Sequence, residues 1–326
     1  MRRAVSASRS KPHLFTNTTC LWYNIIIDRE TQVLLQPQER ERNTMATILK
    51  GIEVANGMKE SLTARVTALR EKGKDPCLGI IRIGERPDDL SYERGAIKRC
   101  EGIGLSCKVF SFPESISNDD FTAELKKINS DSGIHGILVF RPMPKHIDEE
   151  NVKALINPEK DMDCMSPVNI AKVFAGDATG YAPCTPSAVM ETLRHFDIPL
   201  KGKRVTIVGR SMVVGKPLAM LLLKEHATVT ICHTRTIDLE GECGKAEILI
   251  AAAGVPKMIN AGFVSKGASV IDVGINVDAD GNLCGDVDFD SVEPLAGSIT
   301  PVPGGVGAVT TSVLAKHTIE ACEKGI

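Results

Sequence analysis

Short apolar runs of strand length alternate with longer amphipathic runs along most of this chain, and this alternation restricts the fold more than any other feature. In the first half, strand-like runs occupy residues 77–83, 106–112 and 136–140. In the second half, they occupy residues 204–208, 227–232, 247–253 and 269–274. Helix-like runs lie between them, one continuing through Ile97 and one opening with Ser or Asn at 117–118. Because strand–helix–strand alternation is typical of parallel sheets covered by helices, we predict an α/β fold.

The length of 326 residues suffices for two domains of roughly 100–200 residues each. A helix is predicted at 185–196, with Thr185 as its cap and Pro186 in its first turn. The strand–helix pattern restarts after this helix, which puts the domain join between residues 165 and 186. We therefore predict two α/β domains, one over 45–185 and one over 186–326.

The first 44 residues differ from the rest because they are basic and Ser/Thr-rich at the start and show no sustained periodicity. A transit peptide is one interpretation, but Asp28, Glu30, Glu39 and Glu41 argue against it, since such peptides are poor in acids. We predict that residues 1–44 are a disordered extension outside the core and that the first domain begins at Met45.

Charge and cysteine usage exclude several classes of function. Lys and Arg number 39 against 41 Asp and Glu, so the balance gives no reason to expect nucleic acid or an anionic membrane as a partner. No apolar run approaches the ~18 residues that cross a bilayer. The ten cysteines form no C-x-x-C pair and there is no H-E-x-x-H, so no metal site is predicted. Buried free thiols in a reducing cytoplasm are the simpler interpretation.

Residues 208–217, VGRSMVVGKP, follow a predicted strand and lead into a helix. Gly209 permits a tight turn, Gly215 permits close helix packing, and the helix N-terminus offers amide groups to a phosphate, as in a dinucleotide-binding Rossmann fold. Ser211 stands where the standard G-x-G-x-x-G pattern has its middle glycine. A purely structural turn therefore remains the alternative.

The next strand ends in His233, Thr234 and Arg235, where an NAD-binding fold usually carries an acid for the ribose hydroxyls. Arg210, Thr234 and Arg235 are suited instead to a 2′-phosphate, which favours NADP over NAD. The alternatives are that Arg235 is a solvated loop charge, that His233 only packs or caps, and that NAD is used.

Several further segments share one resemblance. They are KDMDCMSPVN (160–169), APCTPSAVMETL (182–193), TVTICHTRT (228–236), AAAGVPKMI (251–259), GASVIDVGIN (267–276), CGDVDF (284–289) and ITPVPGGVGAVT (299–310). Together with the turn at 208–217, they resemble, in order and spacing, the motifs of the methylenetetrahydrofolate dehydrogenase/cyclohydrolase family. The resemblance covers essentially all of residues 45–326, and its P-V-P-G-G-V-G segment is highly specific.

The resemblance implies a folate-binding catalytic domain followed by an NAD(P)-binding domain, with a cleft between them, a C-terminal helix at about 308–323 that packs back toward the first domain, and usually a homodimer. It implies oxidation of 5,10-methylenetetrahydrofolate and hydrolysis of the methenyl product, in one-carbon metabolism. It implies that the substrate is bound by Tyr92, Asp163, Pro301, Pro303, Gly304 and Gly305. It implies that the cofactor is bound by Gly209, Arg210, Ser211, Gly215, Pro217, His233, Thr234, Arg235, Gly254 and Ile275.

Some positions depart from the family pattern. Ala96 stands at the position of the family's lysine, four residues after Tyr92, and Phe140 stands at the position of the glutamine that supports this lysine. Lys98 is no simple substitute, because two residues along a helix turn a side chain by about 200°. Asp89 takes the place of a serine, and Cys164 that of a glycine.

These departures separate the two activities. Hydride transfer requires mainly that two rings be held together, whereas hydrolysis of a methenyl cation requires an acid/base group worth roughly 10²–10⁴-fold. With Tyr92 and Asp163 present and the lysine absent, we predict a dehydrogenase whose cyclohydrolase activity is weak or lost.

Three other functions stay open. The first is a bifunctional enzyme in which Arg141, Lys98 or Asp89 assists water. The second is a non-catalytic folate- or nucleotide-binding protein, and the third is a dehydrogenase for another substrate. At the level of single residues, Tyr92 as a packing residue, Asp163 as a helix cap and the Pro-Gly loop at 301–305 as a simple turn are the structural alternatives.

Overall fold

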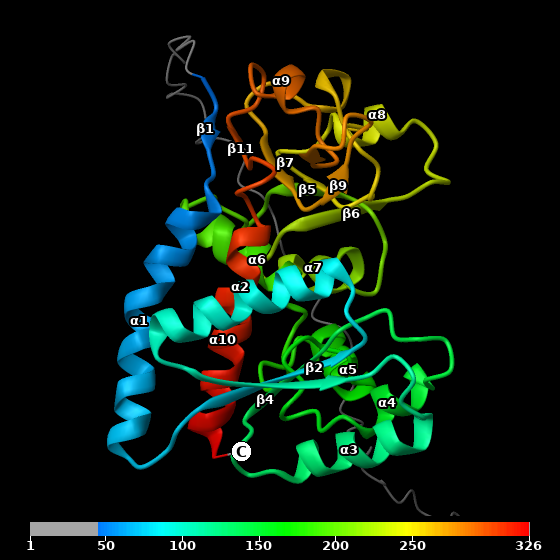
Figure 1. Cartoon of the computed structure of the whole chain (residues 1–326). Helices are drawn as coiled ribbons and strands as arrows, with labels where there is room; N and C mark the ends of the chain where they lie inside the picture. Colours follow the sequence, from blue (N-terminus) through cyan, green and yellow to red (C-terminus); the bar gives the residue numbers. More distant parts are fainter. Residues whose placement is uncertain (1–44, 326) are drawn as a thin grey trace, which may run out of the picture. The chain divides into compact units, whose positions relative to one another are not determined.

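Two parallel sheets, one of three strands and one of six, organise residues 45–325, the part of the chain that the computed structural model describes (Figure 1). The predicted extension at 1–44 lies outside the described residues. The chain is α/β as predicted, because every strand pair in these two sheets is parallel and helices connect most of the strands.

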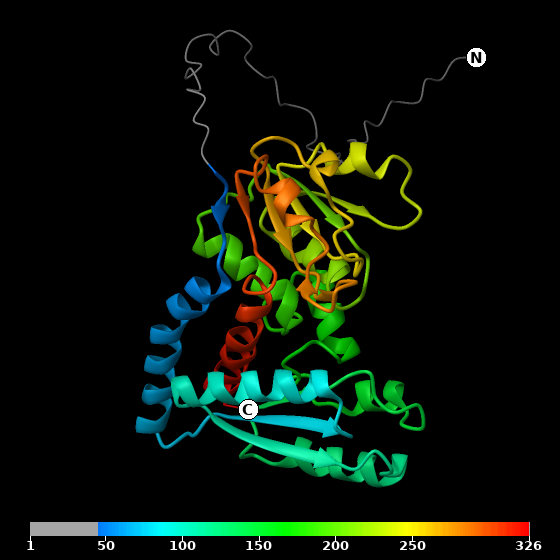
Figure 2. The same cartoon turned by 45° about the horizontal axis from the view of Figure 1, so that its top comes forward.

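The smaller sheet has the order β3-β2-β4. Its strands are β2 (Cys77–Ile83), β3 (Ser106–Phe112) and β4 (Gly136–Val139), and its helices are α2 (Pro87–Ile103), α3 (Asn118–Ser130) and α4 (Glu149–Leu155). Side chains alternate across β2: Ile80 packs with Cys100 of α2, and Ile81 packs with Phe121 of α3. Figure 2 accordingly shows α2 and α3 on opposite sides of this sheet.

Helix α2 continues past Ile97, where the prediction placed its end, to Ile103. Gly104 then adopts a φ of 76°, so that its amide and the next one close the helix on the carbonyls of Glu101 and Cys100. The additional turn places Cys100 and Ile103 in the core and gives the helix that carries Tyr92 a longer buried face.

The larger sheet has the order β1-β11-β8-β7-β5-β6. Strand β5 lies between β6 on one side and β7, β8 and β11 on the other, so the strand order reverses at β5, as in a Rossmann-type sheet. Its strands are β1 (Thr47–Ile48), β5 (Arg204–Val208), β6 (Thr228–Cys232), β7 (Ile248–Ala251), β8 (Ser269–Asp272) and β11 (Ser298–Ile299). Its helices are α7 (Gly215–Lys224), α8 (Leu239–Cys243), η1 (Ala261–Phe263) and α9 (Phe289–Val292). A separate antiparallel pair, β9 (Asn276–Val277) and β10 (Leu283–Cys284), follows β8.

Strand β1 differs from the predicted division of the chain. Thr47 pairs with Ser298 of β11, so the beginning of the predicted first domain is part of the larger sheet. A strand of two residues has no periodicity that sequence alone could reveal. The chain then leaves the sheet directly into α1 (Gly51–Glu71).

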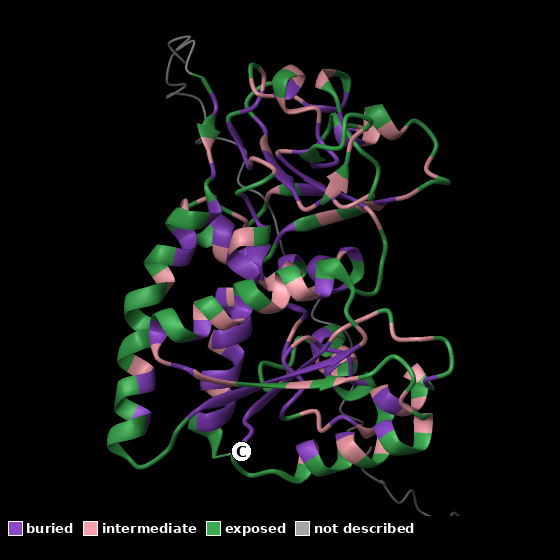
Figure 3. Ribbon diagram, in the orientation of Figure 1, coloured by how far each residue is buried: buried purple, intermediate pink, exposed green. Residues whose placement is uncertain are grey.

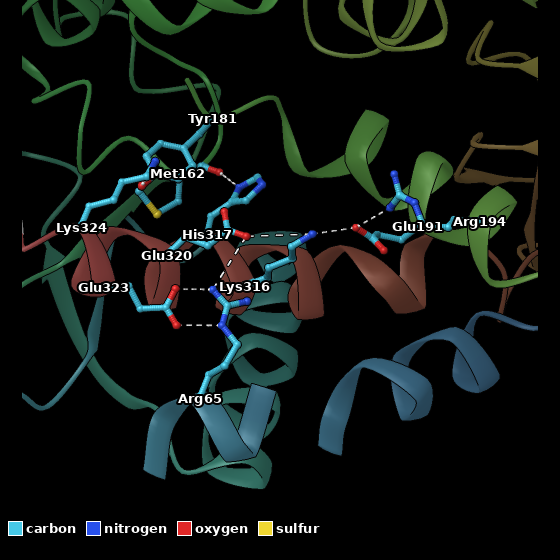
Figure 4. A network of polar contacts seen from close by, with 10 residues as sticks. All are labelled: Arg65, Met162, Tyr181, Glu191, Arg194, Lys316, His317, Glu320, Glu323 and Lys324. Atoms are coloured by element: carbon cyan, nitrogen blue, oxygen red, sulfur yellow. Dashed lines mark hydrogen bonds and ion pairs between the residues drawn. The ribbon is translucent and has the colours of Figure 1, made fainter. Parts of the chain in front are cut away.

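Helix α10 (Gly307–Lys324) contacts α1, α2 and α6 (Cys184–His195), and most of its residues are buried (Figure 3). Ion pairs fasten it at its surface (Figure 4): Arg65 of α1 binds Glu323 at 2.6 Å, and Lys316 binds Glu191 of α6 at 2.9 Å. Inside, His317 Nδ1 lies 2.9 Å from the carbonyl of Met162. These contacts hold α10, whose N-terminus follows the Pro-Gly loop at 301–305.

Among the described helices, none combines the length and the apolar character needed to cross a membrane.

Candidate active site

Tyr92 lies on α2 with its ring edge-on to Phe140, which directly follows β4. The ring centroids are 5.9 Å apart and the planes meet at 88°. Burial is the main cause that raises the pKa of the Tyr92 hydroxyl well above its usual range, and the Thr310 hydroxyl in the first turn of α10 acts against it through a hydrogen bond. Tyr92 is therefore a neutral phenol able to donate a hydrogen bond.

Ala96 lies one turn after Tyr92 and is almost completely buried. It belongs to an apolar cluster against which Tyr92 and Phe140 pack. Lys98 is exposed, as expected from its rotation away from this face. No amine therefore replaces the family's lysine from within α2.

Asp163 holds the start of α6. Its Oδ1 accepts a hydrogen bond from the Cys184 amide at 2.8 Å, and its Oδ2 lies 4.0 Å from Nη2 of Arg141. The predicted cap Thr185 is wrong: α6 begins one residue earlier, at Cys184, because a carboxylate from a distant loop binds the first amide. Asp163 is thus a cap, and its side chain also stays partly exposed beside Arg141.

The loop that carries Asp163 is rigid and strained. Buried Asp161 accepts hydrogen bonds from the amides of Met165 and Ser166 at 2.9 and 2.8 Å. Burial raises the pKa of Asp161, and these hydrogen bonds oppose the rise. Cys164 has a φ of 57°, a left-handed conformation that costs a residue other than glycine roughly 1–2 kcal/mol. A glycine at this position, as in the family pattern, would be free of this strain.

Asp89 is a second carboxylate on this part of α2. It is buried, and burial raises its pKa, with Arg86 opposing the rise. It lies three residues before Tyr92 and seven before Ala96, so all three share one side of the helix. Asp89 is therefore a carboxyl on α2 that holds its proton to a higher pH than an exposed aspartate does.

The cofactor turn between β5 and α7 requires both of its glycines. Gly209 has a φ of 138°, and a Cβ there would lie 2.1 Å from the carbonyl oxygen of Ala252. A Cβ on Gly215 would lie 2.0 Å from the carbonyl oxygen of Gly209. Ser211 accepts a hydrogen bond from the Val214 amide at 3.0 Å and closes the turn. The N-terminus of α7, with Pro217 in its first turn, follows directly.

The loop after β6 presents exposed side chains beside this turn. The His233 ring accepts a hydrogen bond from the Arg235 amide at 3.1 Å, so it caps the loop, as the alternative interpretation has it. Thr234, Arg235 and Arg210 are exposed. Within residues 45–325, neither arginine forms an ion pair. Both guanidinium groups are free to bind an anion.

A cavity of about 250 Å³ lies between the Pro-Gly loop and the end of β8. It brings together five predicted site residues: Ile275, Pro301, Pro303, Gly304 and Gly305. Gly254 lies at the end of neighbouring β7, exposed and with a φ of 69°.

Two buried aspartates that sequence reasoning missed shape this region. Asp286 accepts hydrogen bonds from the amides of Ala253, Gly254 and Val255 at 2.6 to 3.0 Å. Asp272 accepts hydrogen bonds from the amides of Asp286 and Val287, and burial raises the pKa of Asp272 to about 6. The sequence did contain a signal for them: Asp272 lies inside an apolar strand, and Asp286 lies in the CGDVDF segment. Because carboxylates are rarely buried unless they are hydrogen-bonded, an acid in an apolar strand indicates a structural role.

The described residues contain no group of three or more His, Cys, Asp or Glu side chains placed to share a metal ion. The candidate site therefore has three parts: the surroundings of Tyr92, Phe140 and Asp163, which we call the folate region, the Pro-Gly loop at 301–305, and the turn between β5 and α7.

Comparisons with known proteins give the same order of parts. The catalytic domain of the tetrahydrofolate dehydrogenase/cyclohydrolase family matches residues 49–163, and its NAD(P)-binding domain matches residues 183–326. The chain is 54% identical to the bifunctional protein FolD of Clostridioides difficile over 281 residues, which is 86% of this chain and 98% of that protein.

Solved structures agree in fold. A bifunctional FolD from Campylobacter jejuni has a TM-score of 0.84 at 36% identity, covering 86% of this chain and all of that one. The Trypanosoma brucei dehydrogenase-cyclohydrolase, solved with NADP and an inhibitor, has a TM-score of 0.81 at 36% identity and covers 86% of this chain and 99% of that one.

Proposed function

Because the chain belongs to the tetrahydrofolate dehydrogenase/cyclohydrolase family, we propose that it oxidises 5,10-methylenetetrahydrofolate with NADP and has little or no cyclohydrolase activity. The observation that carries the second half of this proposal is the contact between Tyr92 and Phe140 beside buried Ala96. Apolar atoms occupy the place where hydrolysis needs a titrating group. The reaction belongs to one-carbon folate metabolism, which supplies purine biosynthesis.

The residues present suit the dehydrogenase reaction. NADP, when bound, supplies the acceptor for the hydride. Gly209 and Gly215 let the backbone approach the pyrophosphate, and the α7 N-terminus offers its amides to it. Arg210 and Arg235 suit the 2′-phosphate, because guanidinium groups bind phosphate through paired N–H donors.

The substrate positions follow from the other half of the site. Asp163, fixed by its bond to the Cys184 amide, is suited to hold the polar edge of the pterin. The neutral hydroxyl of Tyr92 would donate a hydrogen bond to the folate, and the loop at 301–305, which lines the cavity at the end of β8, would contact the bound ligands. Domain roles follow: residues 45–185 bind folate, and residues 186–326 bind NADP.

Hydrolysis asks for more than positioning. A water must lose a proton while a ring nitrogen gains one, and this transfer is worth roughly 10²–10⁴-fold. Neither Ala96 nor Phe140 carries a proton that it could exchange, and a guanidinium group such as that of Arg141 has no lone pair with which to accept one. The methenyl product is therefore expected to leave the enzyme unhydrolysed.

Asp89 supports a second candidate, a bifunctional enzyme. Its carboxyl is buried, its pKa is raised, and it lies on the same side of α2 as Tyr92. A carboxyl whose pKa is raised is better suited to acid/base catalysis than an exposed carboxylate, because its pKa lies closer to the operating pH. The curated relatives, among them FolD of Clostridioides difficile, are named bifunctional.

One assay series on purified protein tests these readings. We expect methylenetetrahydrofolate-dependent reduction of NADP, with weaker reduction of NAD. The absorbance of methenyltetrahydrofolate, added separately, should decay no faster with enzyme than without it. Faster decay would establish the bifunctional reading, and a lack of reduction with either nicotinamide would contradict the dehydrogenase.

The family resemblance also supports a homodimer in the cytoplasm. In residues 45–325 all nine cysteines are free, eight of them buried, as suits a reducing compartment. Light scattering after size-exclusion chromatography should give twice the mass of the 35.1 kDa chain. A monomer at micromolar concentration would contradict the dimer.

A further inference from the structure

A larger cavity, of about 550 Å³, lies at the opposite end of the smaller sheet from Phe140. Phe140 follows the last residue of β4, whereas His135, which lines this cavity, precedes its first. The cavity lies where β2, β3 and β4 begin and where α10 ends. Its lining includes Lys74, Lys108 and His135, and we refer to it as the basic cavity.

His135 presents an unused donor to the basic cavity. Its Nδ1 accepts a hydrogen bond from the Cys77 amide at 3.2 Å, so in the neutral ring the proton is on Nε2. Burial, followed by the charge of Lys160, lowers the pKa of His135, which keeps the ring neutral at neutral pH. The residue is only 9% exposed and lines the cavity, and within residues 45–325 Nε2 has no protein hydrogen-bond acceptor. A ligand that enters the cavity can therefore accept a hydrogen bond from Nε2.

The charges around this donor favour an anion. The Lys74 ammonium reaches only the Cys322 carbonyl, at 3.4 Å, and has no carboxylate partner among the described residues. Lys108 forms an ion pair with Asp131 at 3.8 Å, and both side chains are about half exposed. This distance is too long for a hydrogen bond, so the N–H groups of Lys108 remain able to donate to an anion.

Asp75 is the one carboxylate among the residues that line the basic cavity, and it is already bound on both oxygens. Arg70 donates to one at 2.9 Å, and the Ser106 hydroxyl donates to the other at 2.7 Å. The charge of Asp75 is thus neutralised by Arg70. The ammonium groups of Lys74 and Lys108 therefore remain available to a ligand in the basic cavity.

We infer that the basic cavity binds a small oxyanion, a phosphate or a carboxylate group, between the ammonium groups of Lys74 and Lys108 and the Nε2–H of His135. Ammonium groups bind oxyanions through charge-assisted hydrogen bonds, and a partly desolvated imidazole N–H adds a directional contact. This site is separate from the proposed dehydrogenase reaction, and its test does not depend on activity.

The test uses the full chain saturated with NADP, so that the cofactor turn cannot take up the probe. Nitrogen-edited NMR spectra of the histidine rings are recorded while inorganic phosphate, or in a parallel arm glutarate, is added at constant ionic strength. The signals of His135 are assigned by their loss in the His135→Gln variant. They should show the Nε2-protonated tautomer, and they should shift with added anion until the shift saturates. Saturation by phosphate alone or by glutarate alone identifies the source of the anion.

Lysine variants provide the matched control. Lys74→Met and Lys108→Met together should weaken the apparent Kd by about tenfold or more, as the loss of one charge-assisted hydrogen bond already predicts. Lys59→Met with Lys126→Met removes the same charge from exposed helix positions and should leave the Kd within about twofold. The inference is wrong if neither anion shifts His135 in the unmodified protein, or if both double variants weaken binding equally.

Discussion

The cofactor turn and the folate region differ in what shapes them: main-chain atoms shape the turn, and side chains shape the folate region. In the turn, the contacts are between main-chain atoms. Gly209 and Gly215 are required because a Cβ at either position would overlap a carbonyl oxygen of the chain. The folate region is made of side chains from separate elements, with Tyr92 on α2, Phe140 after β4 and Asp163 in a loop that caps α6.

This difference determines which region tolerates change. A Cβ at either glycine of the turn would overlap main-chain atoms, which have nowhere to move. At the folate region, Ala96 and Phe140 replace the polar residues of the family pattern, and apolar packing simply closes around them. One activity of a two-activity family is therefore open to loss without damage to the other.

The largest effect is expected from Gly209→Ala in the cofactor turn. The new methyl group would lie 2.1 Å from the Ala252 oxygen, so the turn must shift and NADP-dependent activity should fall by about 10²-fold or more. The matched control is Gly102→Ala at an exposed position of α2, where a Cβ meets nothing within 4 Å. That change should stabilise the protein by about 0.5–1 kcal/mol and leave activity unchanged. Equal activity in both variants would contradict a phosphate-binding role for the turn.

The reverse experiment restores the polar pair in the folate region. Ala96→Lys with Phe140→Gln should raise methenyltetrahydrofolate hydrolysis by up to about 10²-fold, because a lysine with a lowered pKa becomes available for proton transfer. Ala96→Met with Phe140→Gln is the control, since methionine has a similar length but no amine. If the methionine variant gains as much activity as the lysine variant, the gain does not come from proton transfer.

Much of the architecture was predictable because it depends on local pattern. The strands at 77–83, 106–112 and 204–208 begin and end as the sequence predicts. The strand predicted at 247–253 instead covers Ile248–Ala251, because Asp286 binds the amides of residues 253–255. A side chain 33 residues away in sequence leaves no local signal at the strand it ends.

The candidate site was less predictable for the same reason. Asp163 caps α6 across 21 residues, and nothing near Thr185 in sequence reveals this. The resemblance to a known family supplied the positions of Tyr92, Asp163 and the Pro-Gly loop. It did not supply the support from Asp272 and Asp286, which follows only from their burial and hydrogen bonds.

A smaller effect concerns titration in the cofactor half. Carbon-13 NMR of the side-chain carboxyls should place the midpoint of Asp272 near pH 6, against an ordinary value of about 3.9. Since the folded-state pKa is raised, the stability that Asp272 contributes is fully present below pH ~4 and is lost as the pH rises through about 6. Exposed Asp290 is observed in the same spectra as the reference. A midpoint below about 4.5 for Asp272 would show that its amide donors, Gly274, Asp286 and Val287, outweigh its burial.

The smallest expected effect is also the one that separates the two readings of the folate region. Asp89→Asn keeps the size of the side chain and removes its proton exchange. If the enzyme is a dehydrogenase alone, dehydrogenase turnover should stay within about twofold, because hydride transfer depends on positioning rather than on a titrating group. In the bifunctional reading, Asp89 takes over the work of the absent lysine, so hydrolysis should fall by the roughly 10²-fold or more that an acid/base group supplies. Both rates are also measured from pH 5 to 8. If Asp89 takes part in hydrolysis, the hydrolysis rate of the unmodified protein should depend on pH through the raised pKa of this carboxyl. The Asp89→Asn variant should lose that dependence.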